Sequence, residues 1–117
     1  MSVYEKGLHG EQEACRYLRR KGMKLVASRV RLGRGEIDLI MKEKDTTVFV
    51  EVKYRPHGEA GEGLWAVTPD KRRRMCQAAA LYLEANGLWD TPARFDVVEI
   101  TAQGVYHIPN AFDFEGA

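Results

Sequence analysis

The chain has 117 residues, of which 44% are hydrophobic and 30% charged, with a formal net charge of +1. This length suits one compact domain, and the composition argues against a disordered chain. The polar N-terminus does not resemble a signal peptide, and no run approaches the roughly 20 apolar residues of a membrane span. We therefore expect one cytoplasmic domain over residues 1–117, either an enzyme or a binding module.

The small net charge conceals an uneven distribution. Residues 1–35 contain nine basic and three acidic side chains, a balance of +6, which leaves −5 for the rest. Clustered Lys and Arg favour a polyanionic partner because they release counterions from phosphate backbones. A solvated helix face would give the same pattern, so the charge alone does not select a nucleic acid.

The first predicted element is a helix within residues 4–21, and Gly22 is placed to end it in a left-handed conformation. Its apolar stripe runs from Leu8 to Leu18 at helical spacing and includes Glu11. One acidic side chain therefore points toward the core.

Three strand-like runs follow, at Lys24 to Arg31, Ile37 to Lys42 and Thr47 to Tyr54. Short turns separate them, which predicts an antiparallel meander. In the third run, the two-residue period of a strand places Phe49, Glu51 and Lys53 on one face.

The remaining pattern predicts a loop rich in Gly and Pro, a helix and two strands. The helix has Thr68 as its N-cap, Pro69 in its first position and Gly87 at its end. The other segments are the loop from Pro56 to Gly63, a strand from Arg94 to Ile100, a short strand from Val105 to Ile108, and a tail that packs an aromatic ring or frays. In the strand from Arg94 to Ile100, charged and apolar residues alternate at its start, which favours a structural ion pair between Arg94 and Asp96. The predicted fold is a single α/β domain with a mixed sheet of about five strands flanked by helices.

Two acidic residues interrupt apolar strands. Asp38 lies in IDLIM and Glu51 in VFVEVK, where an isolated ionised carboxylate would be costly. If the two strands pair as a hairpin, the carboxylates approach each other, and a divalent cation would relieve their repulsion. Mg²⁺, or Mn²⁺ in its place, suits oxygen ligands and leaves room for water and phosphate.

Such a site, with Lys53 on the same face, has the parts needed to hydrolyse a phosphodiester. They are a Lewis acid, a bound water of lowered pKa and a nearby cation. A structural cluster of salt bridges is the alternative, because the string Glu-x-Lys is common in strands.

The segment GEIDLIMKEKDTTVFVEVKYR, with GLHGEQEACRYLRRKG before it and RFDVVEI after it, resembles the YraN-like family of predicted bacterial endonucleases. The order of helix, three strands, helix and strand resembles the αβββαβ core of the PD-(D/E)XK nuclease superfamily. The YraN-like family is itself similar to archaeal Holliday-junction resolvases. The resemblance covers about residues 7 to 100 and implies a metal-dependent endonuclease acting on DNA, with branched or junction DNA among its substrates.

The resemblance also implies roles for individual residues. Asp38 and Glu51 match the metal ligands, with the Val52 carbonyl as a third, and Lys53 matches the catalytic lysine. Glu11 matches the acid of the first helix, which faces the same site in related resolvases. Ile37 stands where the superfamily name has a proline.

Basic residues near these motifs are candidates for phosphate contacts, which would position a nucleic acid without reading its sequence. They are Arg29, Arg31, Arg34, Arg55, Lys71, Arg72, Arg73 and Arg74. The alternative for each is a solvated cation. Gln77, in the second helix, resembles the helix glutamine that some nucleases place near the metal, and is otherwise an exposed amide.

Two functions of other classes compete with the nuclease. One is a noncatalytic nucleic-acid-binding or scaffolding protein that retains the fold, and the other is a protein adaptor that uses the basic face. A homodimer is compatible with the nuclease, because symmetric junctions need two active sites.

Overall fold

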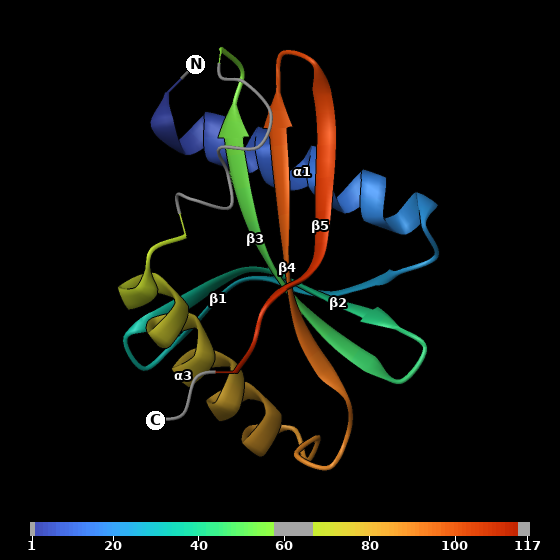
Figure 1. Ribbon diagram of the computed structural model, residues 1–117, viewed down its shortest axis with the longest axis vertical. Coiled ribbons are helices and arrows are strands. Elements are labelled where there is room, and N and C mark those ends of the chain that lie inside the picture. Colours follow the sequence, from blue (N-terminus) through green and yellow to red (C-terminus); the bar gives the residue numbers. More distant parts are fainter. Residues whose placement is uncertain (1, 58–66, 115–117) are drawn as a thin grey trace.

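The computed structural model describes residues 2–57 and 67–114. Figure 1 shows its elements, which are α1 (Val3–Arg20), β1 (Lys24–Leu32), β2 (Gly35–Glu43), β3 (Thr46–Arg55), α3 (Pro69–Ala85), β4 (Ala93–Thr101) and β5 (Gly104–Phe112). The predicted loop from Pro56 to Gly63 lies outside the described residues from position 58 onward.

The five strands form one mixed sheet in the order β1-β2-β3-β4-β5. The pairs β1–β2, β2–β3 and β4–β5 are antiparallel, whereas β3 and β4 are parallel. Adjacent parallel strands need a long connection between them, and the segment that contains α3 provides it. The fold is thus the αβββαβ arrangement with one additional strand, as the sequence predicts.

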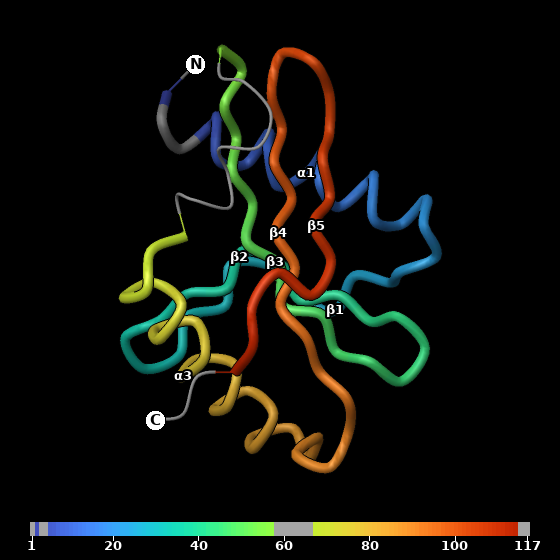
Figure 2. Tube along the Cα trace, viewed as in Figure 1, coloured from blue at the N-terminus to red at the C-terminus, as the bar shows by residue number. Residues whose placement is uncertain are grey.

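The two helices cover opposite faces of the twisted sheet, as Figures 1 and 2 show. On the α3 side, Ile37, Phe49 and Phe95 are fully buried in one core. On the α1 side, Leu18 and Val50 belong to a second core. Two hydrophobic layers of this kind follow from strands whose successive side chains point to opposite faces.

The predicted end of α1 and the predicted start of α3 are confirmed, whereas α1 begins at Val3, one residue before the predicted range of 4–21. Ser2 forms a capping box with Glu5 at the start of α1, and Gly22, with φ +97°, follows its last turn. The Thr68 side chain caps α3 by accepting a hydrogen bond from the Lys71 amide N–H at 3.2 Å. Within the described residues, neither helix is long and apolar enough to cross a membrane.

The last strand is longer than the sequence predicts. It continues to Phe112, whose buried ring stacks on Phe95 with 4.7 Å between centroids. This aromatic contact holds residues up to Phe112 against the sheet. Of the two alternatives predicted for the tail, packing of an aromatic ring and fraying, the structure shows the first.

A polar network joins β4 to β5 and confirms the predicted pair of Arg94 and Asp96. The fully buried Asp96 carboxylate accepts hydrogen bonds from Arg94 Nε at 3.0 Å and from the Asn110 amide at 3.0 Å. His107 Nε2 lies 2.7 Å from the same carboxylate. These contacts lower the pKa of Asp96, although burial alone would raise it, with the His107 and Arg94 hydrogen bonds as the main opposing causes.

The β1–β2 hairpin packs directly on α3 at Gly35. A Cβ atom at this position would lie 2.1 Å from the backbone carbonyl oxygen of Arg74 and 2.9 Å from Ala78 Cβ. Only glycine permits this approach of two backbones. The spacing between the hairpin and α3 therefore depends on this residue.

Three Gly→Ala substitutions should lower the stability of the protein by different amounts, according to what the added Cβ atom would contact. Gly35→Ala should destabilise the protein by about 2 kcal/mol or more, because the main chain of α3 must move. Gly10→Ala should cost less, since its Cβ would meet the Tyr54 side chain at 2.8 Å. Gly7→Ala, which meets only the end of the Arg29 side chain, is the control and should be nearly neutral. Urea unfolding measures all three, and a neutral Gly35→Ala would contradict the close packing.

Candidate active site

Asp38 lies where the β2–β3 ladder ends. The register of the two strands ends with the pair Leu39 and Val50, and Asp38 directly precedes Leu39. Its Oδ2 accepts a hydrogen bond from the Val52 amide N–H at 2.8 Å. A hydrogen bond also joins the carboxyl groups of Asp38 and Glu51. The hairpin therefore brings the two predicted acids into direct contact.

Glu51 is 1% exposed and lies on the α3 face of β3. Its Oε2 is 3.6 Å from Lys53 Nζ, as expected for residues that share one strand face. It is also 2.5 Å from Nζ of Lys71, in the first turn of α3. Two ammonium groups thus face one carboxylate.

The pKa values show how the pair shares its charge. Burial is the largest cause that raises the pKa of Asp38 to about 9, followed by the hydrogen bond to Glu51 and the charge of Glu51. Burial also acts to raise the pKa of Glu51, but the Asp38 hydrogen bond and Lys71 outweigh it, so that pKa is lowered. Near neutral pH these opposite shifts favour a proton on Asp38 and a negative charge on Glu51.

The two lysines shift in opposite directions. Burial lowers the pKa of Lys53, and this effect outweighs the attraction of Glu51. Burial acts in the same direction on Lys71, but the charge of Glu51 and the hydrogen bond to it dominate and raise the pKa of Lys71. Lys53 is therefore the lysine more readily deprotonated.

Two hollows meet at this site. The first, here called the acidic hollow, has a volume of about 700 Å³. Its lining includes Glu11, Asp38, Glu51, Val52, Tyr54, Arg55 and Lys71. The second, the arginine hollow, has a volume of about 540 Å³ and is lined by Arg31, Gly33, Arg34, Gly35, Glu36, Asp38, Lys71, Arg74 and Met75. Asp38 and Lys71 line both, so the two spaces adjoin at these side chains.

Glu11 points inward as the sequence predicts. Its side chain is only 12% exposed and lines the acidic hollow, and its charge contributes to the raised pKa of Asp38. Its carboxylate, however, forms an ion pair with Arg29 at 2.9 Å. In the described residues, Glu11 does not complete a group of three or more acidic, His or Cys side chains able to hold a metal.

The predicted phosphate contacts separate into two groups. The arginine hollow is lined by Arg31, Arg34, Lys71 and Arg74, and the acidic hollow is lined by Arg55. The remaining three are engaged elsewhere. Arg29 pairs with Glu11, Arg72 donates to the Val67 carbonyl and lies over the Phe112 ring, and Arg73 pairs with Asp70. Gln77 is exposed and lines neither hollow.

The sequence analysis missed the direct contact of Lys71 with Glu51. Lys71, Arg74 and Met75 are spaced i, i+3 and i+4, so one face of α3 presents all three. This helical spacing can be read directly from the sequence. It separates Lys71 and Arg74 from Arg72, which points toward the C-terminal strand.

Comparison with known proteins adds the family. The UPF0102 protein of Pectobacterium carotovorum is 44% identical over 108 residues, which cover 91% of this chain and 92% of the relative. The UPF0102 protein of Yersinia enterocolitica is 42% identical over 115 residues, which cover 97% and 98%. That of Nitrosococcus oceani is 42% identical over 100 residues, which cover 85% and 81%. Because the family model also matches residues 10–100, the chain belongs to the uncharacterised protein family UPF0102.

Proposed function

We propose that this protein is a metal-dependent endonuclease that hydrolyses phosphodiester bonds of DNA at Asp38, Glu51 and Lys53. The observation that carries the proposal is the position of the half-buried Asp38 and the buried Glu51, which both line the acidic hollow where the β2–β3 ladder ends. Two acids held together in this way are costly in a purely structural role and typical of sites whose charge is completed by a ligand.

The donor set fits Mg²⁺ or Mn²⁺. Asp38 and Glu51 would supply two carboxylates, and the Val52 carbonyl would be the third ligand. Within the described residues, no cluster of three or more acidic, His or Cys side chains is available for a metal. Mg²⁺ is commonly held by one or two carboxylates with several waters and a substrate phosphate, whereas Zn²⁺ prefers three or four protein ligands.

The chemistry follows from the position of each residue. Bound at Asp38 and Glu51, the metal ion would polarise the scissile phosphate and lower the pKa of a bound water. Lys53, with its lowered pKa, is placed to accept a proton from the attacking water or to stabilise charge beside it. Asp38 must release its proton before it can serve as a ligand.

Two further features support a DNA substrate. Arginines line the hollow beside Asp38, where they would contact phosphates. The αβββαβ order, with Asp38 in the second strand and Glu51 and Lys53 in the third, is similar to the PD-(D/E)XK superfamily and to archaeal Holliday-junction resolvases. We therefore propose branched or four-way-junction DNA as the preferred class, cut by a homodimer.

Cleavage of end-labelled DNA tests this function. Single-stranded, duplex, flap and four-way-junction DNA would be incubated with Mg²⁺ or Mn²⁺. Glu51→Ala and Lys53→Ala should each lower the cleavage rate by about a hundredfold or more, because they remove a ligand and the cation at the reacting centre.

Lys42→Met, on β2 beyond the site, is the control for the loss of one positive charge and should cut normally. Binding of DNA without metal-dependent cutting by the wild type would favour the noncatalytic scaffold. Equal cutting by the wild type and Glu51→Ala would reject the assigned site.

The proton on Asp38 predicts a pH-dependent stability. Because its pKa is raised to about 9 from 3.8, the folded state binds more protons than the unfolded state between these values, so stability falls as pH rises through this window. Asp38→Asn mimics the protonated form. In a chelator the gap in stability between the variant and the wild type should grow by about 1.4 kcal/mol per pH unit, so that it is larger at pH 8 than at pH 5 by up to about 4 kcal/mol.

Urea unfolding at the two pH values measures this gap. Mg²⁺ added at pH 8 should stabilise the wild type but not Asp38→Asn, since only a carboxylate pair attracts the ion. A gap that is independent of pH would show that Asp38 is ionised in the folded protein.

A further inference from the structure

Lys71 occupies an unusual place for a cation. It is the third residue of α3, where its amide N–H is held by the Thr68 cap. The positive end of a helix dipole disfavours an ammonium group there. The interaction that offsets this cost is the contact of Nζ with Glu51 Oε2 at 2.5 Å. The attraction of Glu51, and not the helix that carries Lys71, therefore determines where its ammonium group lies.

This contact conflicts with a metal ion on Glu51. Oε2 already faces Lys53 Nζ at 3.6 Å and Lys71 Nζ at 2.5 Å. A divalent cation bound through the same carboxylate would stand within a few ångströms of both ammonium groups, and repulsion at that range is strong in a buried site. One of the lysines has to withdraw.

Lys71 is the lysine better able to withdraw. Its side chain is 35% exposed, against 20% for Lys53, and it extends from a helix across the gap to the sheet. Lys53 extends from the same strand as Glu51, two residues away, and its backbone is held by the pairing with β4. The flexible stem of Lys71 can move its ammonium without disturbing either element.

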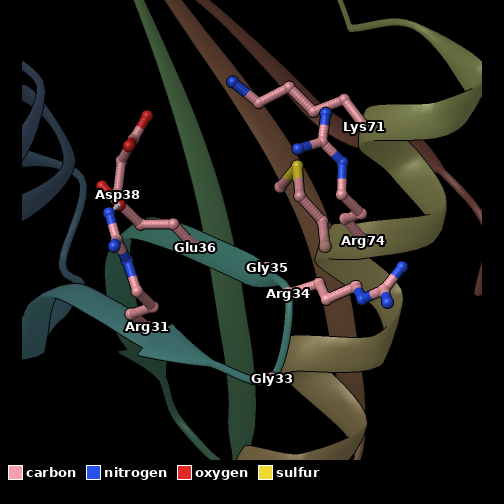
Figure 3. A pocket seen from close by; sticks show the side chains of 9 residues that line it. Arg31, Gly33, Arg34, Gly35, Glu36, Asp38, Lys71 and Arg74 are labelled. Atoms are coloured by element: carbon pink, nitrogen blue, oxygen red, sulfur yellow. Dashed lines mark hydrogen bonds and ion pairs between the residues drawn. The ribbon is translucent and has the colours of Figure 1, made fainter.

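Withdrawal from Glu51 leaves the ammonium beside the arginine hollow. Figure 3 shows Lys71 reaching from α3 toward Asp38, with Arg74 next to it on the same helix and Arg31 across the gap. Arg31 and Arg74 pair with Glu36 and Asp70 at largely exposed positions, where such pairs are weak. The released ammonium would thus join two other cations around one space.

We propose that Lys71 is a resident counter-ion of Glu51 that a divalent cation displaces, and that the displaced ammonium binds the phosphate to be cleaved. The second half rests on the proposed function, whereas the first is a property of the metal site alone. Metal and phosphate then bind cooperatively, because the phosphate takes up the ammonium that the metal ejects.

Mn²⁺ titrations of the full chain test the first half. Lys71→Met should bind Mn²⁺ about tenfold more tightly than the wild type, since the competing cation is gone. Lys42→Met measures the general effect of removing one positive charge and should change the affinity little. Lys71→Arg keeps the charge and should bind Mn²⁺ as weakly as the wild type. Circular dichroism confirms that each variant is folded.

The second half is tested with dimethyl phosphate, the smallest phosphodiester, in the same titrations. It should tighten Mn²⁺ binding by the wild type several-fold and by Lys71→Met much less. With DNA, Lys71→Met should cut at least tenfold more slowly than the wild type in spite of its tighter metal binding.

The outcomes separate the two proposals. Mn²⁺ binding by Lys71→Met that is equal to or weaker than that of the wild type overturns the displacement. Tighter binding with an undiminished effect of dimethyl phosphate overturns the phosphate role. A wild type that binds Mn²⁺ but cuts no DNA defeats the nuclease, while the Mn²⁺ affinities still decide whether Lys71 competes for Glu51.

Discussion

Two carboxyl groups held side by side repel each other when both are charged, and the surroundings of Asp38 and Glu51 reduce that repulsion. Asp38 and Glu51 meet where the β2–β3 ladder ends, so the strands themselves fix their separation. Without a metal the pair is stabilised by one retained proton and by two ammonium groups. A divalent ion bound at this pair, as proposed above, would take the place of the proton and of one ammonium group.

The two faces of the sheet contribute different parts of the site. The α1 face supplies Glu11, held by Arg29 at the rim of the acidic hollow. The α3 face supplies Lys71 and Arg74, on the side of the arginine hollow. The carboxyl pair lies between them on the central strands, which the two hydrophobic cores hold from opposite sides. The two carboxyl groups are therefore on central strands, whereas Lys71 and Arg74 extend from α3, where their long side chains can adjust.

The sequence was sufficient for the element order and for the two acids, because both depend on local signals. Pro69 and Gly22 mark helix ends, and a carboxylate inside an apolar run needs a partner wherever the strand lies. The contact of Lys71 with Glu51 could not be predicted, since it depends on how α3 sits across the sheet after the segment 58–66. The extension of β5 depends on Phe112 meeting Phe95, and the pairing of Arg29 with Glu11 on the approach of α1 to β1. These are tertiary contacts with no local pattern.

The contact at Gly35 has a consequence for how this family can diversify. Because backbone lies against backbone there, the gap between the β1–β2 hairpin and α3 is set by the main chain and not by the side chains that line it. Arg31, Arg34 and Arg74 can then be exchanged for other residues without altering the width of the gap. The residues that line the arginine hollow can therefore change from one relative to another while the carboxyl pair and the width of the gap stay the same.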